Sequence, residues 1–319
     1  MATIDKITAL LKAHYDSNDE TFNTLALQIA ASEAKIGHAV AAKEIKDIVE
    51  KYRYRKTARS VSFMNDGLDE MIQRVDVRYS LQHLIVEDAT RSRIERIITE
   101  YRERNRLRRN GLVNRSKVLL AGPSGTGKTM TANVIASETD LPLFVIRMDK
   151  IITKFMGASS AKLGQVFDAI EQYDGVYLFD EFDALGIDRK RDNEVGEMRR
   201  ILTSFLMFME HVESNSIIVC ATNQINVLDN ALFRRFDDVI HFNLPNLQQI
   251  EKLVAQHLDN KITAVLIPSI AQSLEGYSHA VVCAICKDAI KESILNDKRI
   301  DMDMIRRVTA EKQDYILAV

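Results

Sequence analysis

The chain has 319 residues, of which 46% are hydrophobic and 28% charged, and it contains only 12 glycines and 4 prolines. This composition excludes a disordered, collagen-like or low-complexity chain, and the length suggests about two domains. The 43 basic and 45 acidic side chains give a formal charge of -2, which argues neither for nor against nucleic acid as a partner.

Helices are predicted throughout residues 1–55, which we expect to form a small all-α bundle. Apolar residues recur at helical spacing over 4–11, 22–37 and about 38–53. The N-terminus is amphipathic and lacks the apolar core of a secretion signal, and apolar runs such as Ile217 to Ala221 are far short of the ~18 residues of a membrane span. We therefore expect a cytoplasmic protein without a membrane segment.

Residues 56–80 are predicted to be a linker, because the regular apolar spacing weakens there after the basic run Lys51 to Lys56. A basic helix is predicted from Asp88 to about Arg109. The stretch from Arg91 to Lys117 holds ten basic residues against three glutamates. Such charge can bind nucleic acid, solvate a helix face or line a subunit interface, and the sequence leaves these alternatives open.

Short continuous apolar runs alternate with helical segments through residues 81–245, which predicts an α/β fold with a parallel sheet covered on both faces. The predicted strands are Val118 to Leu120, Leu143 to Ile146, Val176 to Phe179, Ile217 to Cys220 and Val239 to Phe242. Residues 246–319 are predicted to form a separate helical subdomain. In it, Cys283 and Cys286 form a CxxC pair with no second Cys or His pair nearby to complete a zinc site, so we expect both to be buried on one helix face.

A phosphate-binding loop is indicated where a predicted strand meets a predicted helix, because residues 122–129 match GxxxxGK[ST]. The glycines let successive N–H groups face phosphates at the positive end of the helix. Lys128 supplies a mobile charge for the outer phosphates, and Thr129 can ligate Mg²⁺. The predicted ATP-binding residues are Gly122, Pro123, Ser124, Gly125, Thr126, Gly127, Lys128, Thr129 and Met130.

Two carboxylates, Asp180 and Glu181, end the predicted strand Val176 to Phe179. Charges at the end of a buried strand need a cation or water. Asp180 is suited to hold Mg²⁺, and Glu181 to orient and deprotonate the attacking water. Alone, such a pair is commonly a solvated cap, but after a phosphate-binding loop it indicates ATP hydrolysis. Asn223 ends a later strand, where it is either a turn residue or a hydrogen-bond partner of the same water.

With these motifs in order, residues 84–289, roughly two thirds of the chain, resemble the AAA family of AAA+ ATPases. Residues 122–129 are similar to its Walker A motif, 178–181 to Walker B, and Asn223 to sensor 1. The resemblance places Ile85 and Val86 where the backbone brackets adenine. Residues 276–280 are similar to the Gly-Phe-Ser-Gly-Ala motif of the helical lid, with His279 in place of the second glycine.

The resemblance further implies that Arg234 and Arg235 are arginine fingers, which reach into the nucleotide site of a neighbouring subunit. Such residues require a homo-oligomeric ring, expected to be a hexamer. A substrate-gripping pore loop is implied at Lys154, Phe155, Met156 and Gly157, since an exposed aromatic beside a flexible glycine can hold an extended peptide. The alternative is that Phe155 packs in the core. The run Arg189 to Asp192 is either a second pore loop or a solvated charge run.

Together these features predict a Mg²⁺-dependent ATPase ring that remodels or threads a protein substrate. Compact bacterial AAA ATPases similar to this chain are often encoded beside a subtilisin-like serine protease, which makes such a protease a candidate partner. One alternative is an AAA+ protein that acts on nucleic acid through residues 91–117 and 51–59. Another is an ATP-controlled switch that acts on a separate effector through residues 1–55.

Overall fold

The computed structural model describes residues 8–10, 12–13, 19–59, 67–152, 158–185, 192–225, 230–258 and 261–316. The chain divides into two compact units, Met1–Ser62 and Phe63–Val319. Among the described residues, no helix combines the length and the apolar character that crossing a bilayer requires.

The N-terminal unit contains a helical hairpin of α2 (Asp19–Ile36) and α3 (Ala39–Arg59), which pack against each other. The chain reverses at Gly37, whose φ of +100° favours glycine. Ala26 and Ala30 of α2 are buried, as are Ala42 and Val49 of α3. Small side chains at these positions let the two helices approach closely.

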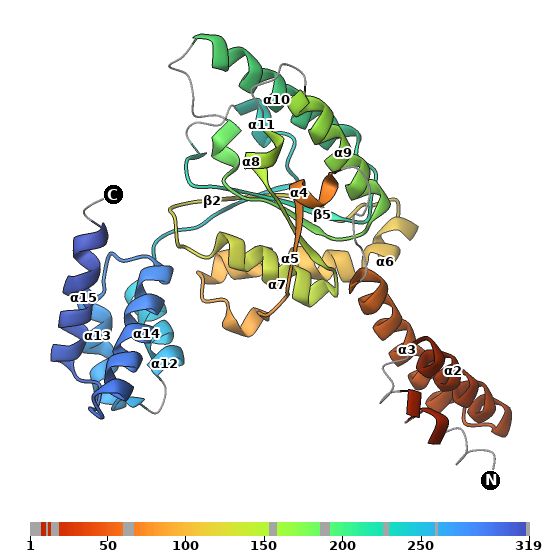
Figure 1. Cartoon of the computed structure of the whole chain (residues 1–319), viewed down its shortest axis with the longest axis horizontal. Helices are drawn as coiled ribbons and strands as arrows, with labels where there is room; N and C mark the ends of the chain where they lie inside the picture. Colours follow the sequence, from red (N-terminus) through yellow and green to blue (C-terminus); the bar gives the residue numbers. More distant parts are fainter. Residues whose placement is uncertain are drawn as a thin grey trace. The chain divides into compact units, whose positions relative to one another are not determined.

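The second unit is built on a six-stranded sheet with the order β1-β3-β4-β5-β2-β6 (Figure 1). The strands are β1 (Ile72–Val75), β2 (Lys117–Ala121), β3 (Leu143–Ile146), β4 (Val176–Phe179), β5 (Ile217–Thr222) and β6 (Asp238–His241). All neighbouring pairs are parallel except β1 and β3. The predicted α/β fold and its five strands are therefore confirmed, with ends that differ by a residue or two.

Strand β1 corrects two expectations, because it lies inside the predicted linker and runs antiparallel to β3. Ile72 is buried and Gln73 exposed, and an edge strand with a single neighbour needs no continuous apolar run. Antiparallel edge strands are common on otherwise parallel sheets. Four residues with one charge and one amide are too short a pattern to reveal such a strand.

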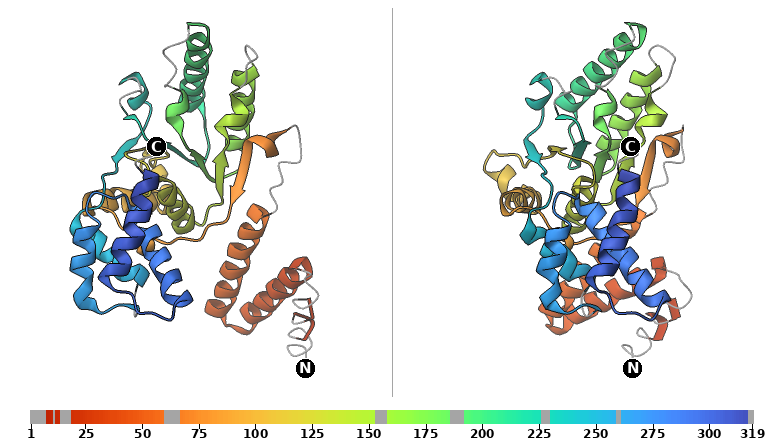
Figure 2. Two further views of the ribbon diagram at one scale, coloured as in Figure 1. Left: turned by 60° about the vertical axis from the view of Figure 1, so that its left-hand side comes forward. Right: turned by 90° about the vertical axis from the view of Figure 1, so that its left-hand side faces the viewer.

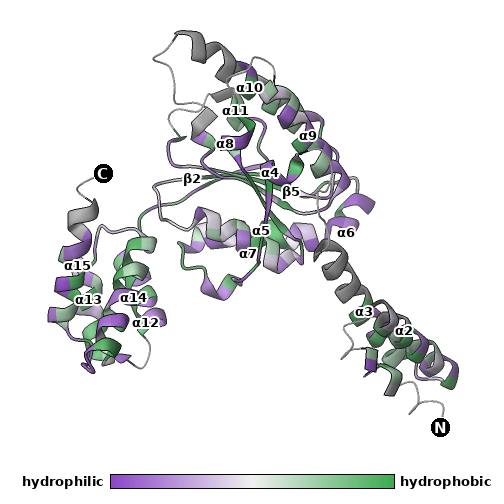
Figure 3. Cartoon of the chain, in the orientation of Figure 1, coloured by the Kyte–Doolittle hydropathy of each residue, from purple (hydrophilic) through white to green (hydrophobic). Residues whose placement is uncertain are grey.

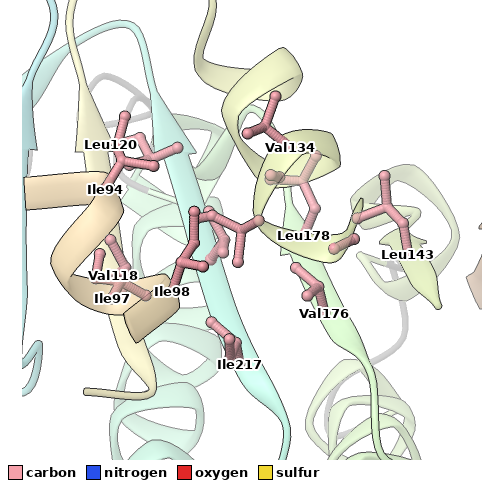
Figure 4. Close-up of a cluster of buried hydrophobic side chains, with 14 of the residues drawn as sticks. Ile94, Ile97, Ile98, Val118, Leu120, Val134, Leu143, Val176, Leu178 and Ile217 are labelled. Atoms are coloured by element: carbon pink, nitrogen blue, oxygen red, sulfur yellow. The ribbon is translucent and has the colours of Figure 1, made fainter. Parts of the chain in front are cut away.

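Both faces of the sheet are covered by helices (Figures 1 and 2). On one face, Ile94, Ile97 and Ile98 of α5 (Asp88–Arg102) join a core with Val118 and Leu120 of β2 (Figure 4). Helix α7 (Lys128–Thr139) contributes to the same core.

On the opposite face, the Phe179 ring lies 6.0 Å from Phe167 of α9 (Ala158–Gln172) and 5.2 Å from Phe205 of α10 (Asp192–His211). Because side chains of a strand alternate between two buried faces, the strands read as unbroken apolar runs.

The predicted basic helix is divided at Glu103 into α5 and α6 (Arg104–Arg109), and α6 is largely hydrophilic (Figure 3). Beyond the sheet, four helices share a core of their own and constitute what we call the helical subdomain. They are α12 (Leu247–Leu258), α13 (Ile267–Ser273), α14 (His279–Leu295) and α15 (Met302–Ile316). The remaining short elements are α4 (Leu68–Met71), η1 (Leu81–His83), α8 (Met148–Ile151), η2 (Phe182–Leu185), α11 (Asn230–Phe233) and η5 (Ala264–Leu266).

Candidate functional site

Three predicted motifs meet at one edge of the sheet. Strand β5 lies between β2 and β4 and is parallel to both, so the carboxyl ends of all three strands face the same way. The phosphate-binding loop follows β2, the two carboxylates follow β4, and Asn223 follows β5. Ligands of open α/β sheets bind at this edge.

The phosphate-binding loop is packed so closely that glycine is required at two positions. A Cβ atom at Gly122, where φ is +153°, would lie 2.1 Å from the carbonyl oxygen of Phe242. One at Gly125, where φ is +73°, would lie 2.6 Å from Ser278 Oγ. The loop is thus held between the end of β6 and the start of α14, and it leads directly into α7, whose positive N-terminal end suits an anion.

Lys128 is 6% exposed, and its Nζ donates to three protein oxygens. They are the carbonyl oxygens of Gly122 (2.7 Å) and Pro123 (2.8 Å) and the side-chain Oδ1 of Asn223 (2.9 Å). Burial lowers the pKa of Lys128, and the nearby charges of Asp180 and Asp183 offset part of this effect. An ammonium has three N–H donors, so a phosphate oxygen must displace at least one of these partners.

The candidate metal ligands lie in contact. Thr129 Oγ1 donates to Asp180 Oδ2 at 2.8 Å, and Asp180 Oδ1 accepts the backbone N–H of Glu181 at 3.0 Å. A hydroxyl and a carboxylate, completed by phosphate oxygens and water, are the hard oxygen ligands that Mg²⁺ takes in nucleotide sites. These residues therefore fit a Mg²⁺ site.

Glu181 is exposed to the pocket and has a φ of +52°, which is uncommon for a residue with a side chain. Such backbone conformations persist where the surrounding structure enforces them, and they are concentrated at functional sites. Here the turn after β4 directs Asp180 toward Thr129 and leaves the Glu181 carboxylate free for water.

Asp183 is a site residue that the sequence reasoning missed. It is 7% exposed, and its Oδ1 accepts the backbone N–H of Asn223 at 3.1 Å. The carboxylate thereby fixes the turn that presents the Asn223 amide to Lys128. Its position three residues after Asp180, at the start of η2, is the only sequence signal that could have pointed to it.

These groups line a pocket of about 510 Å³, which is large enough for a nucleotide. Residues from 124 to 130, both carboxylates and Asn223 form one end. Of the two residues expected to bracket adenine, Ile85 lines the pocket, whereas Val86 packs with the sheet core. Gly122 and Pro123 do not line it and instead accept hydrogen bonds from Lys128.

Most residues of the opposite wall belong to the helical subdomain. The wall is formed by Tyr79, His83, Leu84, Leu253, Gln256, His257, His279, Ala280, Cys283 and Lys287. Of these, the sequence connected only His279 and Ala280 with the site, through the resemblance of residues 276–280 to the lid motif. Positions 279, 283 and 287 of α14 share one helix face.

The CxxC expectation needs a correction at this wall. Cys286 is buried in the helical core, whereas Cys283 is only half-buried and lines the pocket. Burial raises the pKa of Cys286 to about 12 and that of Cys283 in the same direction. Within the described ranges, no group of three or more His, Cys, Asp or Glu side chains could hold a metal ion.

Helix α7 also holds the segment that forms the wall near Tyr79. Asn133 Oδ1 accepts the backbone N–H groups of Arg78 (3.1 Å) and Tyr79 (3.0 Å), and Glu138 Oε1 accepts that of Leu81 (3.1 Å). The helix that begins at the phosphate-binding loop therefore also positions the part of the opposite wall around Tyr79.

Arg234 and Arg235 are exposed and do not line this pocket. Arg235 Nη1 instead lies 2.6 Å from Glu210 Oε1. The structure therefore brings together the loop, the carboxylates and Asn223, but not the arginines. The proposed pore loop, Lys154 to Gly157, and Arg189 to Arg191 lie outside the described residues.

Comparison with known proteins gives a consistent result. Residues 118–244 match the AAA family, described as the ATPase family associated with various cellular activities. An uncharacterized AAA family ATPase of Sinorhizobium fredii, y4kL, is 29% identical over 286 residues, which are 88% of this chain and 87% of that protein.

Longer relatives match over part of their length. The ATP-dependent zinc metalloprotease FtsH of Parabacteroides distasonis is 31% identical over 214 residues, 63% of this chain and 30% of that protein. FtsH of Heterosigma akashiwo is 30% identical over 247 residues, 73% of this chain and 37% of that protein. The chain thus spans about a third of the length of these FtsH relatives.

Proposed function

We propose that this chain, in which residues 118–244 form an ATP-hydrolysing AAA ATPase domain, is a subunit of a homo-oligomeric ring that remodels a protein substrate. The proposal rests on one observation: the chain brings together only some of the residues that the ATP site is expected to contain. The phosphate-binding loop, the carboxylates and Asn223 converge within one chain, whereas Arg234 and Arg235 are exposed away from that pocket.

Within the pocket, each residue has a task that its contacts support. Lys128 exchanges a protein oxygen for an outer phosphate oxygen of ATP, while the loop N–H groups bind the other phosphates. Thr129 and Asp180 would hold Mg²⁺, which when bound offsets phosphate charge. Glu181, exposed to the pocket, orients the attacking water and accepts its proton. Asn223, held by Asp183, accepts Lys128 through Oδ1 and binds the same water through its Nδ2 donors.

The arginines supply the missing charge from a neighbouring subunit. Phosphoryl transfer concentrates negative charge on the transferred group, and an arginine supplied in trans stabilises it. Arg234 and Arg235 follow α11 at the exposed surface, where a second copy of the chain can meet them. In this proposal Arg235 leaves Glu210 when the ring forms, which costs little because exposed ion pairs contribute at most about 1 kcal/mol.

A protein substrate is favoured over nucleic acid because most arginines of the basic stretch, residues 91–117, contact partners within the same chain. Arg102 is 2.8 Å from Glu138 and Arg91 is 3.0 Å from Glu95, while Arg93 pairs with Asp238. Three more arginines also have partners in the chain: Arg104 lies over the Tyr101 ring at 4.3 Å, Arg108 donates to Asn215 at 2.7 Å and Arg115 pairs with Glu100. These contacts give the arginines a role within the subunit, so the charge of this stretch does not by itself indicate a nucleic-acid partner.

The FtsH relatives point to a protein substrate, because their name describes them as ATP-dependent metalloproteases. In the part of the chain that the structure describes, no group of three or more His, Cys, Asp or Glu side chains could hold a metal ion. We propose that the ATPase acts on, or for, a separate protein, and a subtilisin-like protease is one such partner to test.

Two substitutions in the full-length chain test the site. Lys128→Ala should abolish tight ATP binding, because no other side chain takes its place among the phosphates. Glu181→Gln should bind ATP like the wild type and lose ~10²- to 10⁴-fold in turnover, the usual contribution of a general base. Binding is measured by calorimetry and turnover by phosphate release, with Glu275→Gln, an exposed glutamate outside the pocket, as the matched control. If Glu181→Gln kept wild-type turnover, Glu181 would not be the base.

A further inference from the structure

His279 is a buried histidine whose ring is left unpartnered by the chain. It is 9% exposed, and within the described residues neither Nδ1 nor Nε2 has a hydrogen-bond partner. Buried polar atoms almost always find a partner, and leaving one unsatisfied is costly. The sequence places this imidazole where the resembling AAA motif has a glycine, so the family pattern offers no role for it.

The ring lies between two cavities. It lines the nucleotide pocket, and it also lines a second cavity of about 10 Å³. The second cavity is bordered by polar side chains as well, among them Glu87, Thr90 and Asn243. Its volume is at the lower limit for one water molecule, which the polar lining could hold. Water in the second cavity can therefore hydrogen-bond one ring nitrogen of His279, which leaves the other ring nitrogen for a ligand in the nucleotide pocket.

The position of His279 is fixed by its two neighbours. The Ala280 N–H donates to the carbonyl oxygen of Gly125 at 3.0 Å, and Ser278 packs so closely on Gly125 that a Cβ there would clash. The start of α14 is thus attached to the phosphate-binding loop. An imidazole between these two anchors is pre-organised for a ligand in that loop, and little entropy is lost on binding.

The surroundings of the ring match the uncharged end of a nucleotide. Ile85, Leu253 and Cys283 line the same pocket and form an apolar surface that suits a flat base. Burial lowers the pKa of His279, and the nearby Ile85 backbone offsets part of this effect. A neutral imidazole has one donor and one acceptor, which are complementary to the ring nitrogens and amino group of adenine.

We propose that His279 is a specificity-determining residue of this pocket, which hydrogen-bonds the adenine base through one ring nitrogen while water in the small cavity satisfies the other. The inference rests on the proposed ATP site, and it adds a contact by which the helical subdomain identifies the base.

The test is a set of double-mutant cycles between the protein and the base. Calorimetry measures the Kd of wild type and His279→Ala for ADP, 7-deaza-ADP, 1-deaza-ADP, the purine analogue without the 6-amino group and 2′-deoxy-ADP. His279→Ala should bind ADP about 5- to 10-fold more weakly, the value of one hydrogen bond. At least one base analogue should show a similar loss in the wild type and none in His279→Ala. His279→Asn, which keeps a donor and an acceptor, should restore part of the affinity.

His211→Ala is the control, because His211 is an exposed histidine that does not line the pocket. It should leave the Kd for all five nucleotides unchanged. Equal analogue-to-ADP ratios in wild type and both His279 variants would overturn the inference, as would a loss confined to 2′-deoxy-ADP, which would indicate a ribose contact. A wild type that binds no ADP would instead overturn the proposed function. Melting temperatures confirm that each variant is folded.

Discussion

Asn223 holds Lys128 before ATP binds, because its Oδ1 accepts the Lys128 ammonium at 2.9 Å. We propose that the same amide also binds the attacking water through its Nδ2 donors, and that Lys128 moves from Oδ1 to a phosphate oxygen when ATP binds. Asp183 keeps the Asn223 turn in place during this exchange.

Asn223→Ala should therefore separate binding from turnover. We expect ATP to bind at least as tightly as in the wild type, since Lys128 loses one competing acceptor. Turnover should fall by about 10- to 100-fold, as expected when a reacting water is poorly positioned. Calorimetry and phosphate release measure the two effects, and Asn215→Ala, whose amide contacts Arg108 and Asp174 instead, serves as the control. Weaker ATP binding with unchanged turnover would contradict this role.

The sequence predicted the loop, the carboxylates and Asn223, because each is a contiguous motif at the end of an apolar run. Of the opposite wall it indicated only His279 and Ala280, through the resemblance of residues 276–280 to the lid motif. His257 and Lys287 are brought to the pocket by the packing of α12 and α14, which no local sequence pattern indicates. The half-burial of Cys283 was missed for the same reason.

The sequence predicted the strands that are buried on both faces of the sheet, because such strands are continuous apolar runs. The four inner strands, β3, β4, β5 and β2, are almost wholly apolar because helices cover both faces of the sheet, whereas β1 lies at an edge and has a Gln and an Arg among its four residues. The division of the basic helix at Glu103 was likewise not visible, since both halves are equally polar there.

The N-terminal hairpin is the element most easily separated from the rest. Its two helices bury small apolar residues against each other, and residues 1–62 form a unit distinct from the sheet and the helical subdomain. Its surface carries apolar side chains at Ile36, Val40 and Ile48, which are 68%, 82% and 50% exposed. We expect these side chains to contribute to partner binding, as exposed apolar groups do where they gather in one patch.

Deletion of residues 1–62 should accordingly spare ATP hydrolysis and remove partner binding. The retained chain keeps every residue of the nucleotide pocket and the complete sheet. Phosphate release and a thermal melt, compared with the full chain, measure the first expectation. A truncated chain that failed to fold or to assemble would show that these residues belong to the core of the ring.

Protein remodelling makes a prediction about Phe155, which lies outside the described residues. If Phe155 grips substrate, Phe155→Ala should leave ATPase activity, assembly and melting temperature near those of the wild type while substrate remodelling is lost. The comparison variant is Phe144→Ala, since Phe144 is fully buried in β3 and its truncation should cost about 3 to 5 kcal/mol. A similar loss of stability in Phe155→Ala would place Phe155 in the core and remove the main support for threading.

The nucleic-acid alternative predicts a different outcome for the assembled protein. In that case Phe155→Ala would remain functional, and DNA or RNA would stimulate the ATPase in a salt-dependent manner. Charge reversal at Arg104, Arg108 and Arg109 would abolish the stimulation. Filter binding and ATPase assays across a salt series distinguish these results before any protein substrate is known.

The central claim is that two subunits complete each ATP site, and a mixing experiment tests it most directly. One variant carries Lys128→Ala, and the other carries both Arg234→Ala and Arg235→Ala. Each variant alone should be nearly inactive. The turnover of the arginine variant should fall by ~10³-fold or more, although this variant still binds ATP. In a random equal mixture, about one quarter of the interfaces join an intact pocket to intact arginines, so activity should rise toward about one quarter of the wild type. No recovery at any mixing ratio, in assemblies shown to contain both variants, would contradict the shared site.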